Sequence, residues 1–313
     1  MENIKNAANL IEKGELVSFP TETVYGLGAN ACDSDAVLKI YQMKKRPDFN
    51  PLICHVAHQD AIADYAVLKD LDMLLAQAFW PGPMTLILDK KQNTKISDLV
   101  TAGLNTVGFR VPEHPTAHQL LSAVNCPIAA PSANVSGQIS PTSFEHVEAA
   151  FSDAVYILNG EAPSVGIEST ILRCHDQDVE ILRPGSITKE MIEALIGRPC
   201  LERMSSNINA PGQMTSHYAP KAKLILNNAQ NDSADGFIDF GGQFKSLPEN
   251  IPYVDLSPKG DLSEAAKNLF AVLHKLDKCA STIIVAKIPD HGIGIALNDR
   301  LKRAAAPKDD HAR

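Results

Sequence analysis

Residues 15–28 read ELVSFPTETVYGLG, and this stretch decides how the first part of the chain is interpreted. Glu15 to Phe19 is typical of a strand, and Pro20 ends it because proline has no backbone N–H for a sheet ladder. A run of hydroxyl groups and glycines follows directly, up to Gly28. Open α/β sheets bind ligands at the ends of their strands. The stretch therefore predicts a sheet domain with a candidate pocket beside it.

The same stretch leads into a match to the dinucleotide fingerprint GxGxxA at residues 26–31. That fingerprint needs an unbroken strand directly before it and an acidic residue about 20 residues further on. Pro20 interrupts the approach, and Arg46 lies at the position of the acidic residue. We therefore do not expect a dinucleotide site.

Strand and helix patterns alternate outward from this point. We expect helices in residues 4–14, 33–45, 71–79, 142–151 and 188–196, with Thr142 and Glu145 as a capping box. Strands are expected in residues 51–57, 84–88, 106–111, 127–130 and 154–158, and residues 169–183 are expected to form a hairpin. This interleaving predicts a mixed α/β sheet domain in residues 1–200.

The periodicity disappears between residues 201 and 220, where the chain is polar and interrupted by proline and glycine. A second α/β pattern follows, with strands expected in residues 223–226, 236–240 and 282–285 and helices in residues 263–278 and 295–305. We therefore expect a linker in residues 201–220 and a smaller α/β domain in residues 221–313. A length of 313 residues suits two domains.

Composition and charge narrow the class of protein. The net charge of −8 argues against stable nucleic-acid binding, which depends on a basic surface. The six cysteines form no CxxC pair, which indicates thiols in a reducing compartment. The charged, amphipathic start predicts no signal peptide, and no apolar run approaches the ~20 residues of a membrane helix. We expect a cytoplasmic protein with no membrane contact.

No metal site is predicted from the sequence. His114 and His118 lie four residues apart, a spacing that suits metal ligands, but no third ligand stands nearby. Surface histidines explain the pair more simply.

Four groups of residues together indicate a pocket for an anion. They are the stretch at residues 20–28, the cations of residues 44–46 with Asn50 and His55 beyond them, the small polar run APSANVSG at residues 130–137, and the single arginines Arg110 and Arg183. Small residues let backbone N–H groups approach a phosphate closely. Taken alone, each group could equally be a plain turn or a solvated helix end.

Eight motifs follow one another along the chain: PTETVYGLG (20–28), KxRP (44–47), PLICHV (51–56), FWPGPMT (79–85), FRVP (109–112), APSANVSG (130–137), ESTI (168–171) and LRPG (182–185). In this order and spacing they resemble the YrdC-like threonylcarbamoyl-adenylate synthases. Residues 211–212 and 216–220 resemble the linker of the longer, two-domain form of that family, and residues 292–305 resemble its end. The resemblance implies a twisted, YrdC-like mixed-sheet domain, a linker and a Rossmann-like second domain. The composition of the linker, with its rigid turns and an aromatic side chain, predicts in addition that it closes as a lid over the nucleotide.

The resemblance also implies a reaction. L-Threonine and bicarbonate give a carbamate, which attacks the α-phosphate of ATP and releases pyrophosphate. Such a displacement depends on positioning and charge neutralisation more than on a protein nucleophile. The product would pass to a tRNA-modifying threonylcarbamoyl transferase. Mg²⁺ is expected on the triphosphate, with no protein ligands named for it.

Site residues follow from the resemblance, motif by motif. Lys44, Arg46, Ser132 and Asn134 are expected to be catalytic. Thr23, His55, Arg110, Ala130 and Ser169 are expected to hold threonine, with Arg110 on its carboxylate. Arg46, Asn50, Thr106, Ser132, Ser140, Arg183 and Tyr218 are expected to hold ATP.

Two other functions use the same pocket. A non-enzymatic RNA-binding module would grip RNA with it, and the net charge argues against that alternative. Carbamoyl transfer to another acceptor is the second. Larger relatives of that kind carry zinc-finger segments with CxxC repeats, which this chain lacks.

Overall fold

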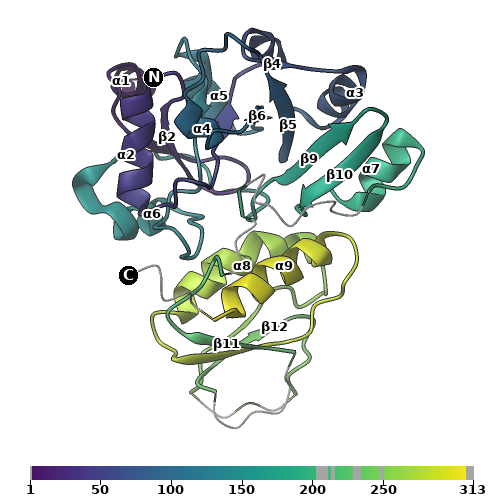
Figure 1. Ribbon diagram of the computed structural model, residues 1–313. Coiled ribbons are helices and arrows are strands. Elements are labelled where there is room, and N and C mark those ends of the chain that lie inside the picture. The colour runs from purple at the N-terminus through teal and green to yellow at the C-terminus, as the bar shows by residue number, and fades with distance from the viewer. Residues whose placement is uncertain are drawn as a thin grey trace.

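The computed structural model describes residues 2–201, 211–212, 216–227, 234–245, 247 and 250–307. Most of the predicted linker, residues 202–210 and 213–215, lies outside these described residues. Within them, the strands form two separate sheets. Figure 1 shows the larger sheet with its helices above and the smaller sheet below.

The larger sheet is built from short strands. They are β1 (Val17–Phe19), β2 (Gly26–Asn30), β3 (Ile53–His55), β4 (Ala66–Val67), β5 (Met84–Lys90), β6 (Thr106–Arg110), β7 (Ile128–Ala129), β8 (Tyr156–Ile157), β9 (Thr170–His175) and β10 (Asp178–Arg183). Their order is β10-β9-β5-β6-β3-β7-β2-β1-β8, and β4 pairs with β5. Three pairs are parallel (β1/β8, β3/β6 and β5/β9) and the others are antiparallel. The expected mixed sheet is confirmed.

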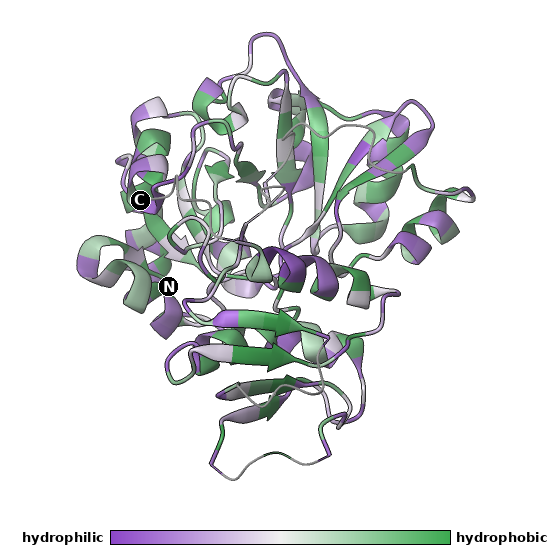
Figure 2. Cartoon of the chain, turned by 60° about the horizontal axis from the view of Figure 1, so that its bottom comes forward, coloured by the Kyte–Doolittle hydropathy of each residue, from purple (hydrophilic) through white to green (hydrophobic). Residues whose placement is uncertain are grey.

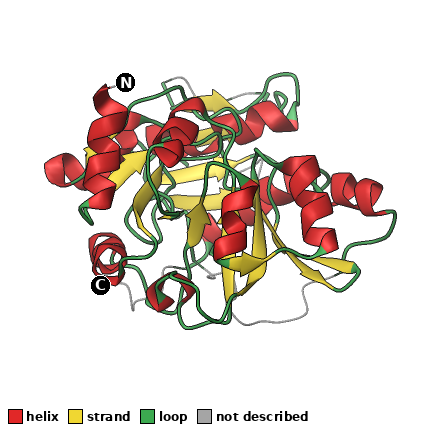
Figure 3. Ribbon diagram, turned by 90° about the horizontal axis from the view of Figure 1, so that it is seen from above, coloured by secondary structure: helices red, strands yellow, loops and turns green. Residues whose placement is uncertain are grey.

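Helices surround this sheet, as the view from above shows (Figure 3). They are α1 (Glu2–Glu12), α2 (Ser34–Lys44), α3 (Asp70–Phe79), α4 (Asp98–Thr101), α5 (Pro115–Ser122), α6 (Phe144–Phe151) and α7 (Lys189–Ile196), with 3-10 turns at Gln59–Asp64 and Ser152–Ala154. Their apolar faces bury residues such as Ile11, Ile40 and Leu75 against the strands.

Local capping explains where several helices begin. Asp33 accepts hydrogen bonds from the first turn of α2. At α6 the capping residue is Ser143, whose hydroxyl accepts from the His146 N–H. The expected capping box of Thr142 and Glu145 is therefore wrong by one residue, because Thr142 precedes the position from which a side chain reaches the first turn.

The apparent dinucleotide fingerprint is itself a strand. Residues 26–30 form β2, which pairs with β1 and β7. A Cβ at Gly28 would lie 2.7 Å from Ile128 Cγ2 and 2.8 Å from Phe19 Cε1. The glycine is thus required for packing inside the sheet, and it does not serve as a phosphate-binding turn.

The second domain has a parallel sheet of β11 (Lys223–Leu226), β12 (Gly236–Asp239), β13 (Tyr253–Asp255) and β14 (Thr282–Val285), with helices α8 (Leu262–Leu276) and α9 (Ile293–Ala305). The strand order is β11-β14-β12-β13, and every described pair is parallel. Figure 2 shows hydrophobic residues along its strands, as parallel sheets require. This is the expected Rossmann-like arrangement.

Helices α8 and α9 lie between the two sheets (Figure 1). One apolar cluster joins Val24 and Ile167 of the first domain to Phe270 and Leu297 of these helices. Gly166, with φ +79°, allows the contact, because a Cβ there would lie 2.4 Å from Lys267 Cα. The two domains therefore share a packed interface.

Among the described helices, none combines the length and apolar character that a bilayer span requires.

Candidate functional site

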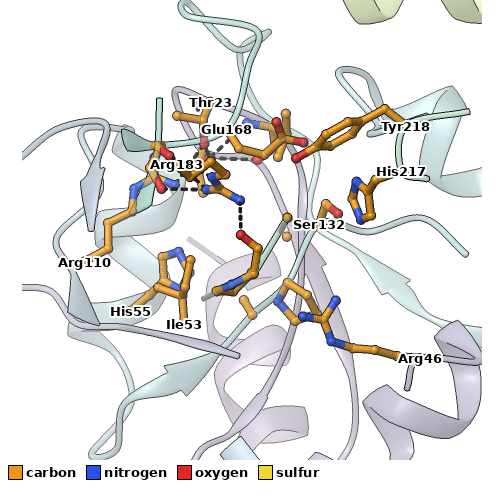
Figure 4. A pocket seen from close by; sticks show the side chains of 18 residues that line it. Thr23, Arg46, Ile53, His55, Arg110, Ser132, Glu168, Arg183, His217 and Tyr218 are labelled. Atoms are coloured by element: carbon orange, nitrogen blue, oxygen red, sulfur yellow. Dashed lines mark hydrogen bonds between the residues drawn. The ribbon is translucent and has the colours of Figure 1, made fainter. Parts of the chain in front are cut away.

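A pocket opens at the carboxyl ends of β3 and β6, close to the second domain (Figure 4). Nine of the expected site residues line it: Thr23, Arg46, His55, Arg110, Ala130, Ser132, Ser169, Arg183 and Tyr218. The other lining residues are Thr21, Val24, Gly26, Ile53, Pro131, Glu168, Pro211, Gly212 and His217. Segments that are far apart in sequence thus meet at one place, as the sequence predicts.

Arg110 lies at the end of β6 and is held rigidly. Its Nη2 forms an ion pair with Glu22 Oε1 at 2.7 Å, and Nη1 donates to Thr23 Oγ1 at 2.9 Å. Its Nε donates to the Gly82 carbonyl at 3.4 Å. A guanidinium has five N–H donors, and N–H groups on both Nη atoms remain available, because Nη2 makes the ion pair but no hydrogen bond within the described residues. This geometry suits bidentate binding of a carboxylate.

Arg183, at the end of β10, faces the start of β9. Its Nε and Nη2 donate to the Ser169 carbonyl at 3.1 and 2.9 Å, and Nη2 also lies 3.1 Å from Ser169 Oγ. The Ser169 hydroxyl lies 2.8 Å from Thr85 Oγ1. Burial lowers the pKa of Arg183. An anion in the pocket would stabilise this desolvated cation.

Arg46 follows α2 and enters the pocket from the opposite side (Figure 4). Its Nε donates to the Asn50 carbonyl at 3.0 Å, and Nη2 donates to the Pro51 carbonyl at 2.8 Å. Burial lowers the pKa of Arg46 to about 10, so it stays charged at neutral pH. Asn50 is outside the lining and supports Arg46 through its backbone.

Lys44 and Asn134 lie behind the pocket wall. The Lys44 ammonium donates to the carbonyls of Ser132 and Asn134, and the Lys44 carbonyl accepts from Ser136 N–H at 2.8 Å. The Asn134 amide donates to the carbonyls of Val135 and Gln138. Both side chains therefore shape the loop at residues 130–137, and neither is part of the pocket surface.

Two further expected residues also lie outside the lining. Thr106 begins β6 and Arg110 ends it. At a rise of about 3.3 Å per residue, the two lie roughly 13 Å apart, so the structure does not bring Thr106 to the pocket. Ser140 is buried and donates its hydroxyl to Glu168 Oε1.

Glu168 and His217 line the pocket, although no role was predicted for either side chain. The position of Glu168 in the sequence does indicate that it has a charged partner, because a carboxylate directly beside the buried strand β9 needs one. That partner, Arg300, lies 132 residues away, so no local pattern could identify it. His217 is found only beside Tyr218, in a stretch without periodicity.

Tyr218 belongs to both the pocket and the domain interface. It is fully buried, its ring packs 5.5 Å from that of Phe270, and it lines the pocket. Its hydroxyl and the Nδ1 of His217 have no hydrogen-bond partner among the described residues. Buried polar groups are normally hydrogen-bonded, so these two atoms point to a polar ligand.

The electrostatics of the pocket favour an anion. Three guanidinium groups, those of Arg46, Arg110 and Arg183, line it. Burial, followed by the charge of Arg110, lowers the pKa of His55 to about 3. Burial and the surrounding cations likewise lower the pKa of His217. Both imidazoles are therefore neutral at pH 7 and offer hydrogen bonds without adding charge.

In the described part of the chain, no group of three or more His, Cys, Asp or Glu side chains could hold a metal ion. Glu168 is the lining residue with a carboxylate, and its oxygens already contact Arg300 and Ser140. A metal bound directly by protein carboxylates does not fit this donor set.

Both halves of the chain match known protein families. Residues 9–185 match the Sua5/YciO/YrdC family, described as telomere recombination, and residues 187–306 match a family described as threonylcarbamoyl-AMP synthase, C-terminal domain. The chain belongs to the threonylcarbamoyl-AMP synthase family. The resemblance seen in the eight sequence motifs is therefore confirmed.

Individual relatives are similar to this protein in sequence and in structure over nearly the whole chain. The threonylcarbamoyl-AMP synthase of Bacillus subtilis is 41% identical, over 96% of this chain and 92% of that protein. The synthase of Pyrococcus abyssi is 37% identical, over 96% of this chain and 94% of that protein. The crystal structure of P. abyssi Sua5 complexed with L-threonine matches with a TM-score of 0.87 at 35% identity, over 96% of this chain and 94% of that chain.

Membership of the threonylcarbamoyl-AMP synthase family decides between the alternatives left open by the sequence. The relatives are named as enzymes, so the enzymatic interpretation is confirmed over the non-enzymatic RNA-binding module. The expected two-domain α/β architecture is confirmed as well.

Proposed function

We propose that the pocket binds ATP, L-threonine and bicarbonate and joins them into threonylcarbamoyl-AMP, with release of pyrophosphate. The observation that carries this proposal is the convergence of three buried guanidinium groups from three separate segments on one pocket. The threonine-bound relative and the names of the similar proteins support it.

Arg110 is the proposed anchor for threonine. The N–H groups that remain on its Nη atoms suit the substrate carboxylate, while Thr23 and Ser169 offer hydroxyl groups in the same pocket. His55 is neutral, so it can accept or donate a hydrogen bond without repelling the ammonium group. Ala130 supplies a small apolar surface at the same wall.

Arg46 and Arg183 are the proposed partners of the triphosphate, with Ser132 and Tyr218 as hydrogen-bonding groups. The unpartnered Tyr218 hydroxyl and His217 Nδ1 face the same cavity. Lys44, Asn134, Asn50 and Ser140 would act indirectly, by holding the lining residues in place. Thr106 is not included in this ATP site.

The proposed reaction needs no protein nucleophile. The threonine ammonium group first releases a proton to solvent, and the neutral amine nitrogen then attacks the bicarbonate carbon. Loss of water from this adduct leaves a carbamate. A carbamate oxygen then attacks the α-phosphorus of ATP, the bond from that phosphorus to the bridging oxygen breaks, and pyrophosphate departs with the bonding electrons. Fixed cations stabilise the negative charge that develops on both fragments. Arg46, Arg110 and Arg183 supply such cations.

Mg²⁺ is proposed as the counter-ion of the triphosphate. Among the described residues, the lining offers hydroxyl groups and cations and no uncommitted carboxylate, which fits an ion held by phosphate oxygens and water. When bound there, the ion would supply charge neutralisation on the leaving pyrophosphate.

The product is a mixed anhydride, which reacts readily with water and amines. We propose that it passes to a threonylcarbamoyl transferase that modifies tRNA. We also propose a cytoplasmic location, because the substrates are metabolites and all six cysteines are free thiols.

An experiment with labelled bicarbonate tests the function. The purified chain is incubated with ¹⁴C-bicarbonate, ATP and threonine, and nucleotide products are separated by chromatography. We expect label in an adenylate that appears only when threonine is present. Label that appears equally without threonine, or no labelled adenylate at all, would refute the proposal.

A further inference from the structure

Arg300 lies on α9 of the second domain, yet its guanidinium group contacts the wall of the pocket. The side chain is fully buried. Its Nε lies 3.1 Å from Glu168 Oε2, and its Nη1 donates to the Pro184 carbonyl at 2.7 Å. Its Nη2 lies 3.4 Å from the Glu168 carbonyl. One side chain of the second domain therefore holds two separate segments of the first.

Those two segments carry residues of the pocket. Glu168 directly precedes Ser169, and Pro184 directly follows Arg183. Arg183 and Ser169 also contact each other, since the guanidinium donates to the Ser169 carbonyl at 2.9 Å. Arg300 thus contacts the neighbours of both residues and fixes the spacing between them from behind.

A third pocket residue meets the same guanidinium. The Arg300 Cζ lies 5.5 Å from the centroid of the Tyr218 ring, a distance at which cations attract aromatic faces. Tyr218 reaches the pocket from the chain between the domains, and its hydroxyl is one of the unpartnered buried groups. Arg300 therefore acts on three pocket residues at once. It contacts the sequence neighbours of Ser169 and Arg183, and it contacts the ring of Tyr218 directly.

Glu168 adds an electrostatic part to this arrangement. Its carboxylate lines the pocket, where a free negative charge would repel a triphosphate. Arg300 pairs with one oxygen and the Ser140 hydroxyl donates to the other. Arg300 also pairs with Asp299 at 3.1 Å, and Asp299 in turn pairs with Arg303 at 3.0 Å. This network compensates the charge of Glu168, and the three guanidinium groups of the lining keep the pocket positive.

We propose that Arg300 is a positioning residue, by which the second domain sets the placement of Ser169, Arg183 and Tyr218 and so completes the substrate site. This inference rests on the function proposed above. It assigns the second domain a direct part in substrate binding, beyond support of the fold.

The test measures kinetics and binding of full-length variants. In Arg300→Met the guanidinium contacts are lost while the apolar length of the side chain is kept. We expect the KM values for ATP and for threonine each to rise roughly tenfold or more, since hydrogen bonds to charged groups stabilise by such factors. Calorimetry should show the same weakening of binding. We expect kcat to change less.

Two controls in the second domain separate positioning from stability. Lys302→Met removes an exposed cation two residues further along α9 in the same way and should leave both KM values unchanged. Ile284→Ala, in β14, creates a cavity in an apolar cluster of the second domain that contains no residue of the pocket lining, and it should lower the melting temperature. A loss of folded protein lowers the apparent kcat and leaves KM unchanged, so this variant shows what a purely structural defect looks like.

If Arg300→Met does not fold, Arg300→Lys carries the test. Lysine keeps the charge opposite Glu168 but lacks the planar fork that reaches two carbonyls, so both KM values should still rise. A folded Arg300 variant with wild-type KM values overturns the inference. The failure of the proposed function is distinguishable, because the wild-type chain would then bind neither substrate and produce no labelled adenylate.

Discussion

Arg110 Nη2 lies 2.7 Å from Glu22 Oε1, and both side chains are buried at the proposed threonine site. Glu22 is outside the pocket lining, so it holds Arg110 from behind. A buried carboxylate in this position orients the guanidinium and compensates its charge. The arrangement allows the two effects to be separated by substitution.

Replacement of Glu22 tests this relationship. Glu22→Gln removes the compensating charge, and we expect the free energy of unfolding to fall by about 3 kcal/mol. The amide oxygen still orients Nη2, so threonine affinity should change by less than roughly tenfold. Glu22→Ala removes the orientation too and should weaken threonine binding further. Denaturant titration and calorimetry measure the two quantities. Wild-type threonine affinity in Glu22→Ala would contradict the account.

Arg46→Ala and Arg110→Ala should fail differently. Loss of a charge-assisted hydrogen bond costs roughly 1.5–3 kcal/mol, or about ten- to a hundredfold in affinity. We expect weaker ATP binding mainly in Arg46→Ala and weaker threonine binding mainly in Arg110→Ala. Lys45→Ala, which removes the exposed neighbouring cation, is the control and should bind both substrates normally. The same pattern in both arginine variants, measured by calorimetry, would show that the site is assigned wrongly.

Tyr218→Phe isolates the hydroxyl group of the tyrosine from its ring. The hydroxyl is buried without a hydrogen-bond partner in the described residues, so its removal should leave the melting temperature unchanged or raise it slightly. The ring and its contact with Phe270 remain. We expect ATP binding to weaken by roughly two- to tenfold. Unchanged ATP affinity would exclude a hydrogen bond from this hydroxyl to the nucleotide.

The domain interface should weaken at acidic pH. The rings of His146 and His274 stack at 3.8 Å across the interface. Burial, followed by the charge of His274, lowers the pKa of His146 to about 4. The unfolded chain, with a histidine pKa of about 6.5, binds the proton more strongly, so stability is present above pH 6.5 and falls as pH drops toward 4.

Substitution of the first histidine tests this pH dependence. His146→Phe keeps a stacked ring but cannot take up a proton. Between pH 7 and pH 5 the free energy of unfolding should therefore fall by about 1–2 kcal/mol less in this variant than in the wild type, a difference kept small because the ring is only partly buried. His291→Asn, at an exposed position, is the control. Equal slopes of unfolding free energy against pH in wild type and His146→Phe would contradict the assignment.

Local signals explain which elements could be predicted from the sequence. Helix α7 is bounded by the cap Thr188 and by Gly197, whose φ of +71° suits glycine, and both residues are visible in the sequence. Strand β2 was not predicted, because Gly26 and Gly28 lack the branched side chains typical of strands. Its pairing with β7 depends on residues about one hundred positions away.

The same difference between local and distant information applies to the site. Arg46, Arg110 and Arg183 were predicted because each lies in a distinct motif, and all three line the pocket. The motif that contains Lys44 predicts that the residue lies near the pocket, but it does not predict where the side chain points. In the structure the Lys44 ammonium donates to backbone carbonyls. Arg300 lies in a helix whose own pattern shows only an amphipathic face, so its pairing with Glu168 appears only in the fold.

The most direct test of the central claim is the rate of pyrophosphate release from ATP, with threonine and bicarbonate each omitted in turn. The account predicts release that requires both, because a carbamate must form before the α-phosphate is attacked. Equal rates of release with and without threonine would contradict it.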